Sequence, residues 1–503
     1  MATKRSGQKV EVQEQRLQLA DREEAVDAPA QKKRDKKARK SSSFAGSLEH
    51  GDLVDQSKQP VSICVWVPKG GCGKTTFTFH ISRIFAERGY KVLMVDCDSQ
   101  RDLSQISLRK RFDEETEYQE DYTRYITREG PNKTSVNRTL YQMLQPLISQ
   151  NLGEYRIAEA NPEVILEKTD KGGCLHLLAG HHETDVIDSK LASHESTIQT
   201  FPQNAELIGG VYAAIQRVAQ NMKADIIICD LAPGKGPFTR ALMMSSDYYI
   251  VPVKPDFYSY EAVTSIVDRM TRNPEGATGF AAENHCWIEY AHTYLVPMTA
   301  KCKYPFPKKS PKFLGYVITD YSVHIANNGQ MAQGVVTEQT ARNRERWMNA
   351  IHTVVNRRVT DLVNFSLTNG DRVSSAFEVA SYNALNVVPY LVGKVRSFET
   401  LQSISHIWGV PVPFLDKDKG HFVRDDGFGQ LEPMNGRDIP TYVAKCDFFK
   451  RIFDQIAWTM LSLIHSDNGP GRCRIKEPED LLKSKLGGRP PPSPLFFNAD
   501  RDM

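Results

Sequence analysis

Short apolar runs alternate with helical patterns along much of the chain, and this alternation predicts an α/β fold. The apolar runs that predict strands lie at residues 61–67, 91–96, 175–178, 224–229, 248–253, 313–319 and 386–389. Because these runs are continuous, they indicate strands that are buried on both faces. Such strands, separated by helices, predict a mostly parallel central sheet that helices cover on both faces.

Helical spacing of apolar residues occurs in segments 75–88, 205–222, 342–358 and 446–464. In the first segment, Phe77, Ile81 and Phe85 fall on one face. Gly89 follows that segment and is suited to end a helix. The last segment is also amphipathic, which predicts a helix with one buried face at the end of the folded part of the chain.

Polar stretches divide the chain into one folded domain and two tails. Residues 1–58 lack apolar periodicity and are rich in Gln, Glu, Lys and Ser, which predicts a disordered basic tail. Residues 466–503 are basic and proline-rich and predict a second disordered tail. Between them, we interpret residues 59–465 as a single domain with insertions near 101–170, 272–312 and 322–380.

A glycine loop between the first predicted strand and the first predicted helix carries the clearest chemical signal. Glycine lets the backbone turn amide groups toward an anion, and the N-terminus of the next helix adds a positive dipole end. We therefore expect Lys74 to contact the β- and γ-phosphates of a nucleotide and the Thr75 hydroxyl to bind Mg²⁺. The expected nucleotide-binding residues of the loop are Gly70, Gly71, Cys72, Gly73, Lys74, Thr75 and Thr76.

The loop departs from the generic P-loop pattern in one position and matches a variant of it in full. The generic pattern needs glycine six residues before Lys74, where this chain has Pro68. The variant Lys-Gly-Gly-x-Gly-Lys-Thr, with the additional Lys69, resembles the ParA/MinD family of deviant Walker A P-loop ATPases, in particular its ParA/Soj-like branch. A chance glycine-rich turn is the alternative, but the specified positions coincide with the required strand and helix.

Two carboxylates follow the strand predicted at 91–96, at the sheet edge where ligands bind in such folds. The sequence from Asp96 to Gln100 resembles the family pattern Asp-x-Asp-Pro-Gln, with Ser99 in place of proline. The resemblance implies that Asp98 activates the attacking water and that Asp96 lies in the outer shell of Mg²⁺. The alternative is a pair of helix-capping carboxylates.

Asp230 follows the strand predicted at 224–229, and this is the Walker B arrangement. The carboxylate there holds Mg²⁺ through water, so the expected metal set is Thr75, Asp96 and Asp230. The family more often has Asp-x-Pro-Pro, and Ala232 replaces the first proline. The catalytic residues that the resemblance implies are Lys69, Lys74 and Asp98.

The resemblance covers residues 61–100 and extends more weakly through 175–262, 313–321 and 386–464. It implies that Thr319, at the end of a predicted strand, lies near the base of the nucleotide. It also implies that Pro389 binds nucleotide and that the chain passes the adenine at 395–400.

Composition changes this picture little. Of the 503 residues, 40% are hydrophobic and 25% are charged, with a net charge of +3, as in an ordinary globular protein. No apolar run reaches the roughly 20 residues that span a bilayer, and no apolar signal core follows the N-terminus, which predicts a cytoplasmic protein. The basic run from Lys32 to Lys40 is compatible with a nuclear-localisation signal, a nucleic-acid contact or a solvated tail. Nine cysteines without a C-x-x-C pair imply neither disulfides nor a zinc site.

Two further clusters of residues each allow a functional and a purely structural interpretation. The sequence His181-His182-Glu183 suggests a metal site. However, adjacent histidines do not share a helix face, which favours a loop at the end of a strand. The helix predicted at 342–358 has either a nucleic-acid face or a solvated face, formed by Arg342, Arg344, Arg346, Arg357 and Arg358.

The resemblance implies an ATP-binding and ATP-hydrolysing switch, with ATP and Mg²⁺ as cofactors, that positions or partitions DNA or another cargo. In this family ATP closes a homodimer in which Lys69 would reach the phosphates of the other subunit, and a partner protein stimulates hydrolysis. The C-terminal tail is Pro-rich and not amphipathic, which favours non-specific DNA over a membrane. The alternatives within the superfamily are an ATP-dependent biosynthetic ligase or amidotransferase, or an iron–sulfur carrier, and the lack of C-x-x-C argues against the carrier.

Overall fold

The computed structural model describes most of the predicted domain. The described residues are 59–109, 137–149, 156–197, 200–271, 286–321, 323–325, 338–340, 342–368, 390–425 and 431–468. Apart from residues 466–468, the two predicted tails lie outside these ranges, as do Pro389 and the strand predicted at 386–389. Within the described part of the chain, no helix is long and apolar enough to cross a membrane.

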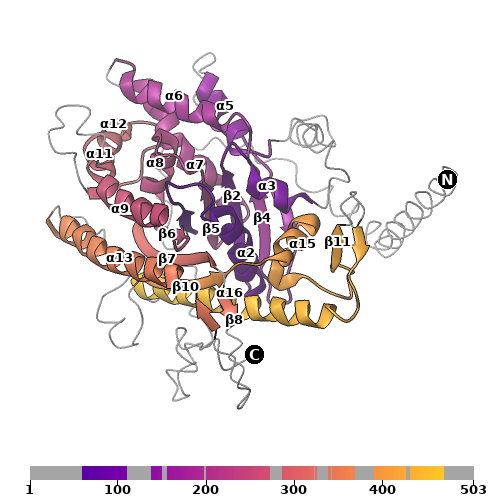
Figure 1. The fold of residues 1–503 in the computed structure, drawn as a ribbon. Helices are drawn as coiled ribbons and strands as arrows, with labels where there is room; N and C mark the ends of the chain where they lie inside the picture. Colours follow the sequence, from indigo (N-terminus) through magenta and orange to yellow (C-terminus); the bar gives the residue numbers. More distant parts are fainter. Residues whose placement is uncertain are drawn as a thin grey trace, which may run out of the picture. The chain divides into compact units, whose positions relative to one another are not determined.

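An eight-stranded sheet forms the centre of the domain (Figure 1). In spatial order its strands are β10 (Leu391–Arg396), β7 (Lys312–Tyr321), β6 (Tyr248–Val253), β1 (Val61–Val65), β5 (Ile226–Leu231), β2 (Lys91–Cys97), β4 (Cys174–Leu178) and β3 (Glu163–Leu166). All neighbours pair in parallel except β3, which runs antiparallel to β4 at one edge. The mostly parallel sheet confirms the predicted fold class, and β5 begins and ends two residues later than its predicted strand.

Helices cover both faces of the sheet, and the alternation of side chains along the strands divides the core into two hydrophobic clusters. Cys64 of β1 belongs to the first cluster, and its neighbours Ile63 and Val65 belong to the second. The first cluster includes α5 (Leu140–Ser149), α6 (Thr184–Thr197), α7 (Ala205–Asn221), α8 (Pro237–Ser245), α9 (Phe257–Thr271) and α13 (Arg342–Thr368). The second includes α2 (Lys74–Glu87), α3 (Asp102–Ser107), α15 (Thr400–Trp408) and α16 (Ile439–Asn468).

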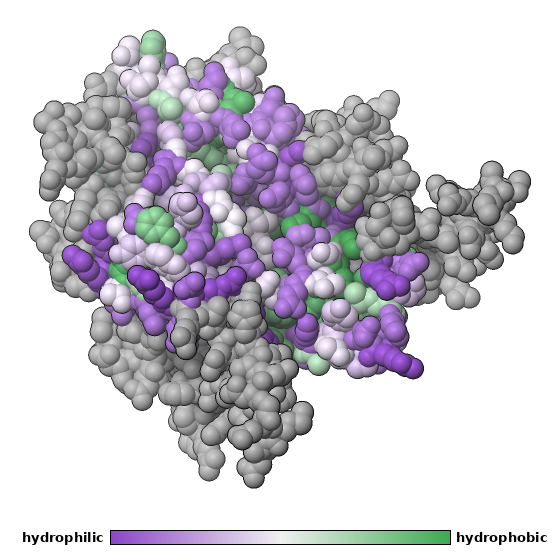
Figure 2. Space-filling view, in the orientation of Figure 1, coloured by the Kyte–Doolittle hydropathy of each residue, from purple (hydrophilic) through white to green (hydrophobic). Residues whose placement is uncertain are grey.

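Short elements complete the described part of the chain. They are α11 (Trp287–Tyr290), a π-helical turn (Ala291–Leu295), α12 (Val296–Thr299), 3₁₀ turns at Pro202–Asn204 and Val412–Phe414, and two antiparallel ribbons, β8 (Val323–Ile325) with β9 (Glu338–Thr340) and β11 (Val423–Asp425) with β12 (Leu431–Pro433). Hydrophilic side chains cover most of the described surface on the face in Figure 2, with hydrophobic residues in separate small patches. This distribution fits a domain whose apolar residues are gathered in its core.

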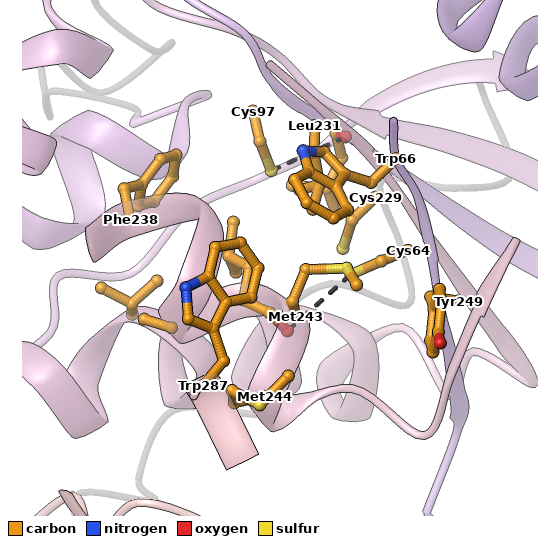
Figure 3. Close-up of a cluster of buried hydrophobic side chains, with 14 of the residues drawn as sticks. Cys64, Trp66, Cys97, Cys229, Leu231, Phe238, Met243, Met244, Tyr249 and Trp287 are labelled. Atoms are coloured by element: carbon orange, nitrogen blue, oxygen red, sulfur yellow. Dashed lines mark hydrogen bonds between the residues drawn. The ribbon is translucent and has the colours of Figure 1, made fainter. Parts of the chain in front are cut away.

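The described part of the insertion predicted at 272–312 is built into the core. Trp287 of α11 is 1% exposed, and its ring lies 5.2 Å from the Trp66 ring at an angle of 36°. Figure 3 shows the two indoles in one cluster with Cys64 and Met243. Because Trp66 Nε1 also donates a hydrogen bond to the Gly234 carbonyl (3.1 Å), this packing fixes the loop that follows β5.

Replacing Trp287 with alanine should lower the free energy of unfolding by about 3–5 kcal/mol, because it removes a buried indole and leaves a cavity beside Trp66. Chemical denaturation of the purified protein measures the change. Tyr258, which is 70% exposed, is the control, and Tyr258→Ala should change stability by no more than about 0.5 kcal/mol. Equal effects of the two substitutions would mean that the segment around Trp287 is peripheral.

Candidate nucleotide site

The glycine loop connects β1 to α2 at the carboxyl ends of the central strands. Gly71 and Gly73 have φ angles of +69° and +78°, in the left-handed region that favours glycine. A Cβ on Gly73 would lie 3.4 Å from Thr319 Oγ1. The same hydroxyl donates a hydrogen bond to the Cys72 carbonyl (2.8 Å). Thr319, near the end of β7, therefore holds the loop in place against the sheet.

Lys74 is the first residue of α2, and its ammonium group contacts the backbone of the glycine loop. The Lys74 Nζ donates to the Lys69 carbonyl (3.1 Å), and the residue is 7% exposed. Burial lowers the pKa of Lys74, whereas the Asp230 and Asp98 carboxylates act in the opposite direction. A buried cation at the N-terminus of a helix, with carboxylates nearby, can receive a polyphosphate together with a metal ion.

Asp230 of β5 is a buried carboxylate whose oxygens are unpaired. The residue is 1% exposed, and neither Oδ1 nor Oδ2 has a hydrogen-bond partner among the described residues. Burial, and after it the Asp96 charge, raises the pKa of Asp230 to about 8. The Thr75 hydroxyl and the Lys74 ammonium act in the opposite direction. Mg²⁺ prefers oxygen ligands, so an unpaired buried carboxylate beside the Thr75 hydroxyl fits this ion.

Asp96 has a different environment from that of Asp230. Its Oδ2 accepts hydrogen bonds from the Ser104 amide (2.9 Å) and hydroxyl (2.6 Å), and its Oδ1 accepts one from the Asp98 amide (3.2 Å). Burial raises the pKa of Asp96 to about 7, although the bonds from Ser104 oppose this. In the structure Asp96 therefore anchors the first turn of α3, which is the helix-capping role that was the alternative to a place in the metal shell.

Asp98 lies in the loop between β2 and α3 and is only partly buried. Its Oδ1 accepts a hydrogen bond from the Gln100 amide (3.0 Å). Asp98 follows the carboxyl end of β2, and the glycine loop follows the carboxyl end of β1, so in this parallel sheet both lie at the same edge. The structure thus brings together Lys74, Thr75, Asp98 and Asp230 at one end of the parallel strands.

Lys69 is paired within its own chain. Its Nζ lies 2.6 and 2.8 Å from the two Asp256 carboxylate oxygens and 3.2 Å from Ser259 Oγ. The Tyr258 ring centre lies 5.7 Å from the same nitrogen. Burial alone would raise the pKa of Asp256, but the hydrogen bond from Lys69 and the bond from the Ser259 amide outweigh it and lower the pKa.

Sequence reasoning missed the pairing of Asp256 with Lys69. The signal was present, because Asp256 lies in segment 252–262, which resembles the family, and directly precedes α9. Its Oδ1 accepts a hydrogen bond from the Ser259 amide (2.7 Å), so the residue caps α9 while it binds Lys69.

A cavity of about 290 Å³ lies beside the glycine loop. Its aromatic residues are Phe77, Phe398 and Phe453, and its polar residues include Lys254, Asp320, Arg396 and Gln402. Thr319 also lines the cavity, together with residues 395–398 of the segment expected to pass the adenine. Lys254 and Asp320, which both line the cavity, form an ion pair (2.5 Å). Aromatic walls with a few polar groups suit a nucleoside.

The cluster of His181, His182 and Glu183 is a loop between β4 and α6, as expected. Their ligand atoms lie within 4.8 Å of one another. However, the Glu183 amide donates to His181 Nδ1 (3.1 Å), so that nitrogen is already occupied. The Tyr141, His181 and His182 rings are stacked, with centroids 4.6 and 4.4 Å apart, so both imidazoles also belong to an aromatic stack.

The arginines of α13 do not all share one environment. Arg346 and Arg357 are exposed, whereas Arg344 and Arg358 are partly buried, and the side chain of Arg342 is outside those described. Exposed cations are therefore present at two of the positions proposed for a nucleic-acid face.

Residues 61–275 match the sequence model of a family described as an AAA domain, and this range is less than half of the 503-residue chain. An uncharacterised protein of Methanocaldococcus jannaschii is 26% identical over 208 residues, which are 41% of this chain and 64% of the relative. A Rhizobium rhizogenes protein, named as a candidate replication protein A, is 24% identical over 235 residues, which are 46% of this chain and 49% of the relative. The chain thus spans between 49% and 64% of the length of these curated relatives.

Among solved structures, pNOB8 ParA is 16% identical with a TM-score of 0.44, and the similarity covers 81% of this chain and 99% of that chain. The range that matches the family model contains the loop from Lys69 to Thr76 and both Asp98 and Asp230. Within that range the loop carries the additional lysine of the deviant Walker A sequence and precedes a helix at the end of a parallel strand. Residues 61–275 thus match the model of an AAA-domain family, and their loop has the deviant Walker A sequence that resembles the ParA/MinD-like P-loop ATPases.

Proposed function

We propose that the protein is an ATP-dependent switch that binds and hydrolyses ATP with Mg²⁺, dimerises in its ATP state and positions DNA or another cargo. The observation that carries the proposal is the buried Asp230 carboxylate, which has no hydrogen-bond partner among the described residues and is adjacent to Lys74 and Thr75. A buried charge is costly unless a counter-charge joins it, and a metal–nucleotide complex supplies one.

The conformation of the loop supports binding of the triphosphate. A Cβ on Gly70 or Gly71 would meet nothing within 4 Å, so open space adjoins the backbone there. The loop amides and the N-terminus of α2 would donate to phosphate oxygens, and Lys74 would exchange the Lys69 carbonyl for them. Mg²⁺, when bound, would neutralise phosphate charge, and Thr75 and Asp230 are the residues that would hold it.

For hydrolysis, we assign Asp98 as the residue that orients the attacking water. It is partly exposed at the end of β2, whereas the oxygens of Asp96 are engaged by Ser104. A carboxylate in this position would accept a hydrogen bond from the water and take up its proton as the bond to the γ-phosphate forms.

The switch itself would depend on Lys69. The Lys69–Asp256 pair is partly exposed, with side chains 21% and 38% accessible, and such pairs contribute only about 0–1 kcal/mol. Lys69 can therefore leave Asp256 for the phosphates of a second subunit at little cost. Non-specific DNA as the surface, a partner protein that stimulates hydrolysis and a cytoplasmic location are part of the same proposal.

Lys74→Ala should abolish nucleotide binding, because the loop loses the charge directed at the β- and γ-phosphates. Isothermal titration calorimetry with ATP and Mg²⁺ measures the affinity, and circular dichroism verifies the fold. Lys419, which is exposed in the loop after α15, supplies the control Lys419→Ala, expected to bind as the wild type does. Unchanged affinity in Lys74→Ala would rule out the site.

Asp98→Ala should leave ATP binding intact and slow hydrolysis by on the order of 10²-fold or more, because the water loses its orienting carboxylate. Phosphate release at saturating ATP measures the rate. The variant should also accumulate as an ATP-bound dimer. Normal turnover would instead assign Asp98 to the loop structure, through its bond from the Gln100 amide.

Lys69→Ala should leave nucleotide binding by the monomer nearly intact and abolish ATP-dependent dimerisation, together with any DNA binding that needs the dimer. Light scattering with a slowly hydrolysed ATP analogue measures the fraction of dimer. A DNA-binding assay with ATP, ADP or no nucleotide measures the loss of DNA binding. Asp256→Asn is the paired variant, because asparagine can still cap α9 while the ion pair is lost. It should dimerise, and an unimpaired dimer in Lys69→Ala would show that Lys69 acts within its own subunit.

A further inference from the structure

A histidine inside α2 joins segments that are far apart in the sequence. His80 is 2% exposed, and its Nδ1 lies 2.7 Å from the Thr76 carbonyl oxygen. Its Nε2 lies 3.1 Å from the Val412 amide nitrogen, on a segment 332 residues further along the chain. The imidazole therefore connects the helix that follows the glycine loop to the 3₁₀ turn that follows α15.

These two contacts define the protonation of the ring. A backbone amide only donates, so His80 Nε2 must accept the bond from Val412 and carries no proton. Nδ1 then carries the proton of the neutral ring and donates it to the Thr76 carbonyl. Burial lowers the pKa of His80 to about 3, which keeps the ring neutral at physiological pH. Both ring nitrogens are thus fully used, and no apolar side chain can replace both contacts.

The His80 ring also packs directly against two walls of the nucleotide cavity. Its centroid lies 4.6 Å from that of Phe398 and 5.0 Å from that of Phe453, with angles of 10° and 18° between the planes. The Phe398 and Phe453 rings are themselves nearly parallel, at 11°. Phe398, Phe453 and Thr76 all line the cavity, so His80 contacts three of its lining residues from behind.

We propose that His80 is a positioning residue that holds the aromatic wall of this cavity against the P-loop helix and thereby sets the affinity for the base of a nucleoside triphosphate. The inference rests on the nucleotide site proposed above and extends it to the part of the ligand that the loop does not contact. Phe398 follows β10 and Phe453 lies on α16, so neither is attached to α2 through the backbone. The ring contacts of His80 join both to α2, in addition to the Phe77–Phe453 contact and the bonds from Arg88 to Asp454, and its bond from the Val412 amide joins α2 to the turn after α15.

The phosphate-binding loop depends on other contacts. Its backbone is held by the bond from Thr319 to the Cys72 carbonyl and by the bond from Lys74 to the Lys69 carbonyl. His80 takes part in neither. Removing the His80 contacts should therefore displace the wall that meets the base and leave the contacts to the phosphates in place.

The test compares the binding of ATP and of inorganic tripolyphosphate, each with Mg²⁺, by calorimetry on the full chain. His80→Phe keeps an aromatic ring and removes both hydrogen bonds. We expect its Kd for ATP to rise about tenfold, the factor that corresponds to one misplaced aromatic contact, while the Kd for tripolyphosphate stays within about twofold. His80→Asn keeps a polar group near Thr76 and should show the same selective loss of ATP affinity. It is the test variant if His80→Phe does not fold.

Phe85→Leu is the matched control, because Phe85 is buried on the same helix and does not line the cavity. It should leave the ratio of the two dissociation constants unchanged. Equal weakening of both ligands in the His80 variants would reveal a general structural role and overturn the inference, as would wild-type affinity for ATP in both. If the wild-type protein bound neither ligand, the proposed nucleotide site itself would be wrong.

Discussion

The buried carboxylate of Asp230 is the constraint on which the rest of the site depends. Asp230 is the register partner of Asp96 across β5 and β2, and the charge of Asp96 contributes to its raised pKa. The fold stabilises Asp96 through the amide and hydroxyl of Ser104, but it offers Asp230 no hydrogen bond among the described residues. Lys74 and Thr75 are the groups that moderate its charge. Two adjacent strands therefore carry carboxylates in different environments: Asp96 is hydrogen-bonded to the start of α3, whereas neither oxygen of Asp230 has a hydrogen-bond partner among the described residues.

The glycine loop is held by contacts on two sides, and one of these contacts is buried whereas the other is partly exposed. On the β7 side, Thr319 binds the Cys72 carbonyl and is 6% exposed. On the α9 side, Asp256 and Ser259 bind the partly exposed side chain of Lys69. Because Asp256 also caps α9 through the Ser259 amide, the cap would persist if Lys69 left Asp256 in the proposed switch. The buried attachment keeps the loop in shape, and the exposed one can change partners without unfolding the start of α9.

Prediction from the sequence was most complete where the signal is local. The strand, the loop from Lys69 to Thr76 and the following helix are consecutive, and the Asp230 strand is a continuous apolar run, so pattern alone located them. Asp256 pairs with a lysine 187 residues away and His80 with an amide 332 residues away, and neither has a spacing that reveals its partner. Trp287 was assigned to the insertion predicted at 272–312, whose end is basic and proline-rich, yet its contact with Trp66, directly after β1, is formed only by the tertiary fold.

The cavity beside the glycine loop extends beyond the part of the chain that matches the family model. The matched range, 61–275, contains the glycine loop and the carboxylates, but Thr319, Phe398 and Phe453 line the cavity from later in the sequence. β7 and β10 also complete one edge of the sheet. A chain limited to the matched range would keep the phosphate-binding motif and lose both the aromatic wall and the hydroxyl that holds Cys72. Substitutions after residue 275 can therefore alter the walls of this cavity, and with them the proposed nucleotide affinity, while the motif itself stays unchanged.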